Sequence, residues 1–539
     1  MDRRGALSSR VLAAALVVCL AALLPYASTL NNYFVRDDFG VVELLASKPA
    51  SYFPRWFYTP WTDRIWGDIA DEVRPFMAVS YQITALGGAA SPFLHHAMNV
   101  ALHAATGLLV LLMARWLAGL SLTSSVFAAT VFVLLPVQAE TVAWITGRVD
   151  SMPALFYIAA FVAYARWREK GATDSRLYVG SLALFFAALF TKQTTITMVA
   201  TLVAWDVLLS NRPARPTWSW VRPYVPFVLM TMAYMWLRYV LFGQVAREGQ
   251  LNSEGLHYFF VLIERHLARV VTGNVNAGAV VTWGVLAATT VLGWWLARHR
   301  IAGERRRLAR VVLFFGPLWW AIGVLPIAVA GYESPRHVYL ASAGWAIVLG
   351  VVFDLAWTGA IGVARRRAVL AVASAVVIFY STGLYKEVTT WNTLAKVSRK
   401  VLLDTRAEAL SAPPGSLIVI GAPKLSWEWA MPFPLKPPYT RVDLTTRVFL
   451  ISPWLLHCCR NQWVDDTRRI LQTWQDQHTG APVIVLRWDG DTGALSRITD
   501  REYPALRSLV PVLLQVRSRD ALSAAVLKIV DDLPVPTGR

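Results

Sequence analysis

The sequence predicts a mainly α-helical, polytopic membrane protein with a small α/β domain at its C-terminal end. Of its 539 residues, 56% are hydrophobic and 16% are charged, whereas a soluble globular domain carries roughly 25% charged residues. The apolar residues come in long blocks separated by short basic segments, and this pattern ends near residue 392. After that point, short β-type runs alternate with helical patterns.

Eleven segments are apolar and long enough to cross a bilayer, which requires about 20 predominantly apolar residues. The first follows a basic N-terminus and resembles a signal peptide, but its apolar character runs to Leu30 without a clear cleavage site. We therefore expect an uncleaved anchor. Some of the eleven are short, so the count lies between ten and twelve; their approximate limits are 11–30, 92–114, 125–144, 151–166, 177–191, 194–210, 223–242, 279–297, 311–330, 338–358 and 368–386.

Basic residues orient these spans, because cytoplasmic loops of membrane proteins carry an excess of Lys and Arg. If the N-terminus with Arg3, Arg4 and Arg10 is cytoplasmic, every strong basic cluster falls on the same side of the membrane. An odd number of spans then places the tail outside. The clusters lie at 166–176, 211–222, 298–310 and 365–367.

Two domains follow from this topology: a transmembrane domain of residues 1–392 and an extracytoplasmic α/β domain of residues 393–539. A large outer loop, residues 31–91, mixes Tyr, Phe and Trp with charged residues, which is typical of segments in the lipid headgroup layer. Residues 243–278 are similar. In the tail we expect strands at 417–420, 448–451 and 483–486 and helices at 465–477 and 521–532.

The net charge of +18 does not indicate a nucleic-acid partner. Membrane orientation accounts for most of the basic residues, and no Lys/Arg cluster interleaved with aromatic residues marks a nucleic-acid module. Cys19, Cys458 and Cys459 form neither a disulfide framework nor a metal-binding CxxC pair.

Two adjacent carboxylates, Asp37 and Asp38, follow the first span on the predicted outer face. Ionisable residues beside membrane spans are costly to place, which makes them functional candidates. A carboxylate here could accept a proton from a hydroxyl that attacks an activated sugar, or help to hold a divalent cation. The alternative is an ordinary solvated turn after a helix.

Polar side chains also share one face of the second span, where His95, His96, Asn99 and His103 fall together at helical spacing. Such a face can hold a metal ion, but a polar seam that hydrogen-bonds neighbouring helices is the more frequent arrangement. A further charged group, Glu140 with Arg148 and Asp150, lies at the outer turn between the third and fourth spans. Its simplest role is a structural clasp in which these charges pair with one another.

Taken together, these residues resemble a known family. The segments FLHHAMNVALH (93–103) and PVQAETVAWITGRVD (136–150) are similar to the FHxxNxxxHA-type span and the HPVxxEAVAWxxGRxD turn of the multi-spanning O-mannosyltransferases that carry tetratricopeptide repeats, and of their bacterial relatives. The resemblance covers roughly residues 30–395 and extends to Asp37-Asp38, Arg74-Pro75, Thr191-Lys192, Arg238 and the segment 336–342.

The chain also departs from the family pattern. Leu135, Gln193 and Pro335 stand where the family commonly has His, Glu and an acidic residue. The repeats are absent, and the tail that replaces them, beginning near Pro413, is similar to the outer domains of some bacterial members. These departures affect the identity of the substrate more than the fold, and the choice of acceptor does not carry over.

The resemblance implies a type C (GT-C) glycosyltransferase of a bacterial inner membrane. Such an inverting hexosyltransferase moves a mannose-like sugar from a polyprenyl-phosphate donor to an acceptor hydroxyl at the outer membrane face. This transfer needs a base for the acceptor and cations for the departing phosphate. We expect Asp38, with Asp37 as the alternate, to be the base, and Arg238, Arg336, Lys192 and Arg148 to bind phosphate; the other site candidates are Arg74, His96, Asn99, His103, Glu140, Asp150 and Tyr339.

Two alternatives remain at this stage. A carrier or flippase of lipid-linked glycans would share the many spans and the outer cations, but we would expect it to show internal repeats and interrupted helices. The sequence shows neither pattern. An enzyme-like scaffold without activity is the second alternative, because of the departures from the family pattern.

Overall fold

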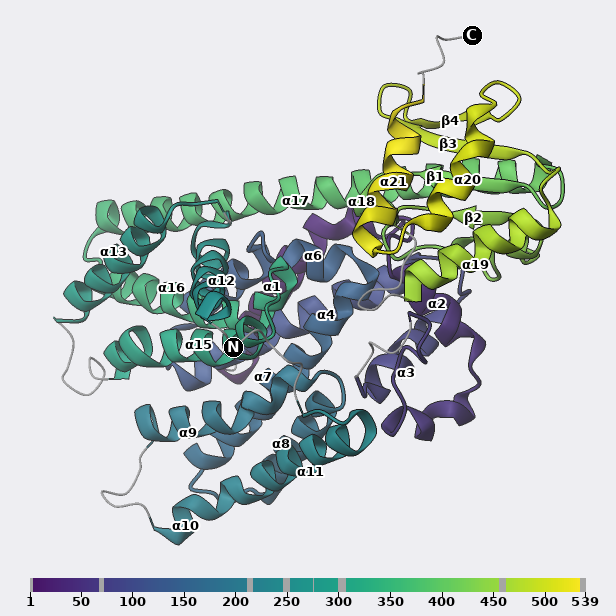
Figure 1. Cartoon of the computed structure of the whole chain (residues 1–539). Coiled ribbons are helices and arrows are strands. Elements are labelled where there is room, and N and C mark those ends of the chain that lie inside the picture. Colours follow the sequence, from purple (N-terminus) through teal and green to yellow (C-terminus); the bar gives the residue numbers. More distant parts are fainter. Residues whose placement is uncertain are drawn as a thin grey trace.

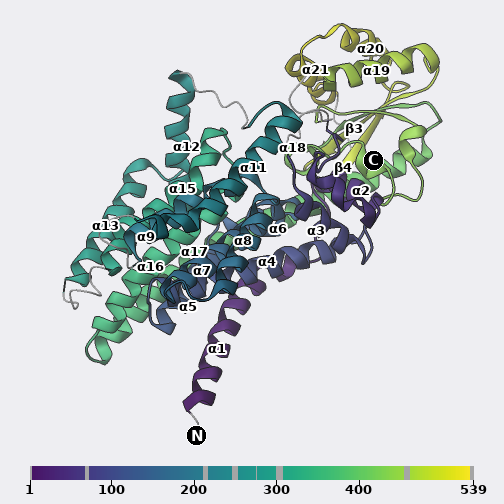
Figure 2. The same ribbon diagram turned by 90° about the horizontal axis from the view of Figure 1, so that it is seen from below.

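The computed structural model describes residues 3–66, 72–210, 217–245, 253–274, 276–298, 307–454 and 462–533 (Figure 1). A bundle of helices forms the larger part, and a small domain with a sheet lies at one end of it. The first helix, α1 (Arg3–Leu23), packs on α4 (Phe93–Leu112) and α5 (Leu122–Leu134), and its N-terminal end projects from the side of the bundle (Figure 2). Cys458 and Cys459 lie outside the described residues.

Within the described residues, seven helices are long and apolar enough to cross a membrane. Shorter apolar helices are α5 (Leu122–Leu134), α8 (Ser175–Leu189) and η5 (Gln193–Thr197) with α9 (Met198–Leu208). A helix is present in every one of the eleven predicted segments. The seven long ones are α1 with η1 (Leu24–Thr29), α4 (Phe93–Leu112) with η3 (Met113–Leu117), α10 (Trp218–Val221) with α11 (Val225–Phe242), α13 (Ala279–Ala297), η7 (Val311–Phe315) with α15 (Gly316–Val329), η8 (Pro335–Val338) with α16 (Tyr339–Gly359), and α17 (Val363–Ser411).

The predicted third span, 125–144, is wrong in its extent. The helix α5 ends at Leu134, and a separate short helix, α6 (Gln138–Ala143), follows it. Pro136 causes the break, because proline has no N–H to donate and forces the residue before it out of the helical region. Leu135 is accordingly extended, with ψ of 133°. The outer turn therefore begins earlier than the apolar run indicates.

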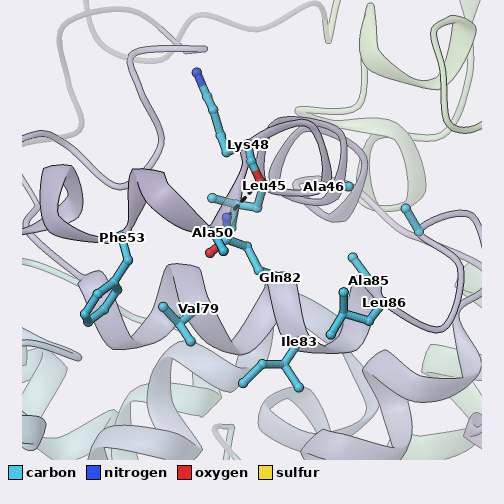
Figure 3. A pocket seen from close by; sticks show the side chains of 11 residues that line it. Leu45, Ala46, Lys48, Ala50, Phe53, Val79, Gln82, Ile83, Ala85 and Leu86 are labelled. Carbon is cyan, nitrogen blue, oxygen red and sulfur yellow. Dashed lines mark hydrogen bonds between the residues drawn. The ribbon is translucent and has the colours of Figure 1, made fainter.

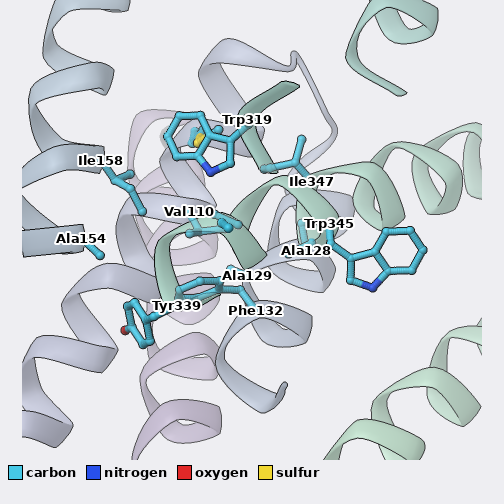
Figure 4. Packing of buried hydrophobic residues seen from close by; sticks show 14 of the residues in the cluster. Val110, Ala128, Ala129, Phe132, Ala154, Ile158, Trp319, Tyr339, Trp345 and Ile347 are labelled. Atoms are coloured by element: carbon cyan, nitrogen blue, oxygen red, sulfur yellow. The ribbon is translucent and has the colours of Figure 1, made fainter. Parts of the chain in front are cut away.

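The centre of the bundle is α16. In its most apolar stretch 83% of the residues are buried, against 11% in α13, which lies at the edge. Close-packed side chains from α5, α15 and α7 (Arg148–Glu169) surround α16 (Figure 4). Small residues allow this approach, since a Cβ added at Gly344 would lie 2.7 Å from the carbonyl oxygen of Gly316.

The last long helix, α17, leads out of the bundle into the tail domain (Figure 1). Its 49 residues would extend roughly 74 Å at 1.5 Å per residue, more than twice the hydrocarbon thickness of about 30 Å. The predicted domain boundary at residue 392 lies inside this helix. The α/β tail is therefore attached through a continuous helix rather than through a linker.

The tail contains a four-stranded sheet with the order β2-β1-β3-β4. The strand β1 pairs in parallel with β2 and β3, while β3 and β4 are antiparallel. The three predicted strands and both predicted helices are present; β4 and α20, a helix that contains Pro511, were not predicted. The elements are β1 (Leu417–Gly421), α18 (Lys424–Trp427), β2 (Phe449–Ile451), α19 (Gln462–Gln477), β3 (Val483–Asp489), β4 (Ala494–Thr499), α20 (Ala505–Gln515) and α21 (Arg519–Asp531).

The outer loop packs against the tail and shares a hydrophobic core with it. The loop forms α2 (Asp38–Ser47), η2 (Ala50–Phe57) and α3 (Pro75–Ala85). The ring of Phe39 lies 5.9 Å from that of Trp427, and the Tyr439 hydroxyl donates to the Phe39 carbonyl at 2.9 Å. Residues 243–278, the other outer segment, include the helix α12 (Ser253–Thr272).

Candidate active site

Two cavities lie near the outer loop. The first, of about 430 Å³, lies between α2, η2 and α3 and has mostly apolar walls (Figure 3). Its one lysine, Lys48, forms an ion pair with Asp63 at 2.6 Å. None of the predicted site residues lines it, so the second cavity is the candidate.

The second cavity, of about 550 Å³, gathers residues that are far apart in the sequence. The outer loop, the connection between α8 and η5, α11, α15 and the tail all contribute to its walls. Four predicted cations, Arg74, Lys192, Arg238 and Arg336, lie together with one predicted carboxylate, Asp37. Apolar residues of α15 form another part of the wall: Leu325, Pro326, Ile327 and Val329.

Asp38 does not line this cavity. It is 1% exposed, and it accepts hydrogen bonds from the backbone N–H of Val35 (3.0 Å) and from the N–H (2.9 Å) and hydroxyl (2.6 Å) of Thr146. Burial raises the pKa of Asp38 to about 7 although these donors favour the carboxylate. Asp38 therefore joins the outer loop to the outer turn, and both of its oxygens have partners.

Asp37 lines the cavity and is half-buried. One of its carboxylate oxygens, Oδ1, is buried and has no hydrogen-bond partner among the described residues. Burial raises the pKa of Asp37 above its ordinary value, against the attraction of Arg36 and Arg336. Of the two adjacent carboxylates, the geometry thus favours Asp37, the alternate, as the group that meets a ligand.

The cations are held around a second carboxylate, that of Asp150. Lys192 forms an ion pair with it, and Arg336 Nε and His337 Nδ1 each lie 3.6 Å from its oxygens. Lys192 and Arg336 thus bring two basic groups to one carboxylate at the cavity, where they can attract an anionic ligand. The Arg336 guanidinium also lies over the Trp144 ring, 4.8 Å from its centre.

The other two cations have additional partners. Arg74 pairs with Glu72 at 2.7 Å and donates to Gln193 Oε1 at 3.3 Å. Arg238 donates from Nε to the Val245 carbonyl at 3.0 Å. Gln193, one of the departures from the family pattern, thus takes part in the cavity wall.

Arg148, predicted to bind phosphate, is not at the cavity. It is completely buried and bonds to Asn99 Oδ1 (2.8 Å), to the Ser80 carbonyl (2.9 Å) and to the His95 carbonyl (2.9 Å). Its guanidinium lies 4.4 Å from the centre of the Tyr81 ring. These contacts connect α3, α4 and α7, which indicates that Arg148 is a structural residue.

The remaining candidates form a hydrogen-bonded seam. Asn99 donates to the Trp144 carbonyl at 2.8 Å, His96 bonds to the Asn32 carbonyl at 3.1 Å, and His103 bonds to the Tyr339 hydroxyl at 2.8 Å. Among the described residues, no group of three or more His, Cys, Asp or Glu side chains could hold a metal ion. The favoured prediction of a polar seam agrees with this arrangement.

The predicted clasp among Glu140, Arg148 and Asp150 is wrong. Glu140 accepts from the Ser334 hydroxyl at 2.6 Å, while Asp150 pairs with the cavity cations and Arg148 with the seam. Residues 148 and 150 lie about 200° apart around a helix, so they face different neighbours.

If Arg148 is structural, Arg148→Met should lower the free energy of unfolding by about 3 kcal/mol, because hydrogen bonds to a buried charged group are lost and their acceptors stay buried. Thermal unfolding of the purified protein in detergent measures this. The matched change Arg469→Met, at a side chain that is 75% exposed, should cost less than about 0.5 kcal/mol. An Arg148→Met protein as stable as the wild type, but weak in lipid-phosphate binding, would return Arg148 to the binding site.

Several cavity residues were not singled out from the sequence. Trp61, Trp66 and Glu72 come from the outer loop, and Trp429 comes from the tail. The aromatic content of the loop was visible in the sequence but was attributed to the headgroup layer. No sequence signal connects Trp429 with residues of the loop.

Comparison with known proteins supports the sequence resemblance. No family model matches the chain. The chain is 30% identical over 204 residues to protein O-mannosyl-transferase Tmtc2 of Drosophila melanogaster, a match that covers 36% of this chain and 21% of that protein. It is 28% identical over 222 residues to human protein O-mannosyl-transferase TMTC4, covering 37% and 30%. The match thus spans between a fifth and a third of the length of these relatives.

Solved structures share the fold of this chain at low sequence identity. ArnT from Cupriavidus metallidurans in the apo state has a TM-score of 0.50 and 14% identity, with 90% of this chain and 94% of that chain covered. Apo oligosaccharyltransferase from Archaeoglobus fulgidus has a TM-score of 0.52 and 11% identity, covering 89% and 69%. The chain therefore has the fold of GT-C glycosyltransferases, and over about a third of its length it is similar in sequence to the O-mannosyl-transferases.

Proposed function

We propose that this protein is a membrane glycosyltransferase. It moves a sugar, mannose-like by its resemblance, from a polyprenyl-phosphate donor to an acceptor hydroxyl at the outer face of a bacterial inner membrane. One observation carries the proposal: a single cavity contains a carboxylate with a buried oxygen that has no partner among the described residues, a group of cations and an apolar wall from α15. A lipid-linked, phosphorylated sugar needs all three.

In this mechanism the acceptor oxygen attacks the anomeric carbon of the sugar while the bond from that carbon to the phosphate oxygen breaks. Asp37 accepts the proton of the acceptor hydroxyl. The negative charge that develops on the departing polyprenyl phosphate is stabilised by Arg336 and Lys192, together with Arg238 and Arg74 of the same cavity. A single displacement of this kind inverts the configuration at the anomeric carbon.

The relatives support this choice of donor. The sequence relatives are named as O-mannosyl-transferases. An archaeal oligosaccharyltransferase, AglB from Archaeoglobus fulgidus, holds an inhibitory peptide and a dolichol-phosphate; it shares a TM-score of 0.50 and 11% identity with this chain, covering 95% and 72%. A polyprenyl phosphate is therefore the lipid to test first.

The direct test uses the purified full-length chain in liposomes with radiolabelled polyprenyl-phosphate mannose and an extract of bacterial envelope as the source of acceptors. We expect label to move from the lipid to acceptor while free polyprenyl phosphate is released. Movement of intact lipid across the bilayer, without cleavage, would support a carrier instead. Neither cleavage nor movement with any polyprenyl-phosphate sugar would leave the inactive scaffold.

The proposed site requires the tail and the cavity to be extracytoplasmic. A phosphatase reporter that is active only outside the cytoplasm should be active when fused after Arg539 and silent when fused near Arg306. Western blots must show equal amounts of both fusions. The opposite pattern of activities would invert the topology and remove the outer-face site.

A further inference from the structure

The wall of the cavity that faces the tail is aromatic. Trp66 of the outer loop and Trp429 of the tail meet edge to face, with ring centres 6.0 Å apart and an angle of 88° between the ring planes. Trp66 also packs against Phe433 at 6.1 Å. Gly40 makes room for this pair, since a Cβ there would lie 2.9 Å from atoms of both Trp66 and Phe433.

Two buried polar atoms of cavity-lining residues have no hydrogen-bond partner among the described residues: Trp66 Nε1 and Thr62 Oγ1. Trp66 is 8% exposed and Thr62 is 4% exposed, and both line the cavity. Buried donors without partners are unfavourable and are normally satisfied by protein, water or ligand. A ligand that carries hydroxyl groups would supply the missing partners.

The tail is held against the outer loop directly beside Asp37. The Arg36 guanidinium donates to the Glu428 carboxylate at 3.3 Å, and the Arg36 N–H donates to the Ser426 carbonyl at 3.4 Å. Trp429 follows Glu428 in a left-handed conformation with φ of +70°, which a non-glycine residue adopts only at some cost. The tail thus contributes Trp429 as part of the cavity wall.

We propose that Trp429, Trp66 and Thr62 form a subsite for a pyranose ring. The apolar C–H face of the sugar packs on the Trp429 ring, and sugar hydroxyls bond to Trp66 Nε1–H and to the Thr62 hydroxyl. This inference rests on the proposed function and adds the location of the sugar within it. The ring belongs either to the donor or to a sugar-bearing acceptor, and the experiment below separates these sources.

The experiment compares two lipids that differ only in the sugar. Affinities for polyprenyl-phosphate mannose and for the same polyprenyl phosphate without sugar are measured on the full-length protein in nanodiscs. Trp66→Phe keeps an aromatic ring, although a smaller one, and removes the N–H. Thr62→Val keeps the shape of the side chain and removes the hydroxyl. Each should weaken binding of the mannosyl lipid about tenfold and leave the sugarless lipid unchanged. Trp429→Ala should have the same selective effect, whereas Trp429→Phe should retain most of the affinity.

A second arm identifies the source of the ring, with methyl α-mannoside as the probe acceptor. If the donor affinities are unchanged in the variants but the KM for methyl α-mannoside rises about tenfold, the subsite takes the acceptor sugar. Unchanged values in both arms, or equal losses for both lipids, would overturn the subsite. If the wild-type protein binds neither lipid, the proposed function is contradicted instead. Binding of methyl α-mannoside, followed by saturation-transfer NMR, would then still test the subsite by comparing Trp429→Ala with Trp429→Phe.

Discussion

Asp37→Asn is expected to lower the turnover of sugar transfer by about 10²- to 10⁴-fold, the range usual for the loss of a general base. The amide keeps the size of the side chain but cannot accept the proton of the acceptor hydroxyl. Donor affinity should be nearly unchanged, because the cations of the cavity remain. Turnover is measured as release of polyprenyl phosphate at saturating donor, with affinity measured separately in nanodiscs.

Asp38→Asn is the matched control at the neighbouring carboxylate. Asp38 accepts three hydrogen bonds from Val35 and Thr146. The NH₂ of an asparagine would face the N–H and hydroxyl donors of these two residues and could not accept from them. We expect lower thermal stability, with the turnover of the folded fraction close to that of the wild type. A large loss of turnover in folded Asp38→Asn, with little effect of Asp37→Asn, would restore Asp38 as the base.

The pH dependence provides an independent check on Asp37. A general base must be deprotonated, and burial raises the pKa of Asp37 above 3.8, so the neutral acid persists to a higher pH than in an exposed aspartate. Wild-type turnover should therefore fall as the pH is lowered, with a midpoint above 3.8. A turnover that does not fall as the pH is lowered toward 3.8 would contradict the assignment of Asp37 as the base.

Arg336→Gln is expected to lower turnover by about 10²- to 10³-fold, the range seen when one preorganised donor to a developing negative charge is removed. Arg336 lines the cavity beside Asp150 and is near enough to Asp37 to attract its charge. Glutamine keeps an amide NH₂ that can donate hydrogen bonds but removes the positive charge. The loss should appear mainly in kcat, since the phosphate carries more negative charge as the bond breaks.

Arg265→Gln is the control for a lost arginine near the same surface. Arg265 pairs with Glu333 at 2.7 Å, its side chain is 47% exposed, and it does not line the cavity. Its replacement should change turnover less than twofold or so. If Arg336→Gln behaves like Arg265→Gln, the leaving phosphate is held by Lys192, Arg238 or Arg74, and the same measurement is repeated at each.

Much of the fold could be predicted because the bilayer imposes local rules on the chain. Each span must satisfy its own backbone hydrogen bonds and present about 20 apolar residues, so apolar length alone predicted a helix in every segment. Basic residues between spans likewise predict orientation without knowledge of packing. The predicted length of the third span was wrong because a proline, rather than a change in hydropathy, ends α5.

For the candidate site, the sequence identified some of the residues and the structure was needed to identify the others. Residue type and spacing, with the family resemblance, singled out Asp37, Lys192, Arg238 and Arg336, all of which line one cavity. The sequence could not favour Asp37 over Asp38 as the base, because the difference lies in tertiary contacts: Asp38 accepts hydrogen bonds from Thr146 and Val35, whereas Asp37 lines the cavity. It also could not separate Arg148 from the other outer cations, since a buried guanidinium and a ligand-binding one have the same sequence signature.

The sequence by itself therefore determined the membrane class, most of the helix positions and a set of charged candidate residues. Only the tertiary structure decided which of those charged residues face a cavity and which are buried in contacts within the protein. Arg148 is of the second kind, since it donates hydrogen bonds to Asn99 and Ser80. It also placed Trp429 of the tail beside Trp66. The physical reason is that hydropathy and helix formation depend on neighbours along the chain, whereas the partners of a buried charge or ring come from segments that only folding brings together.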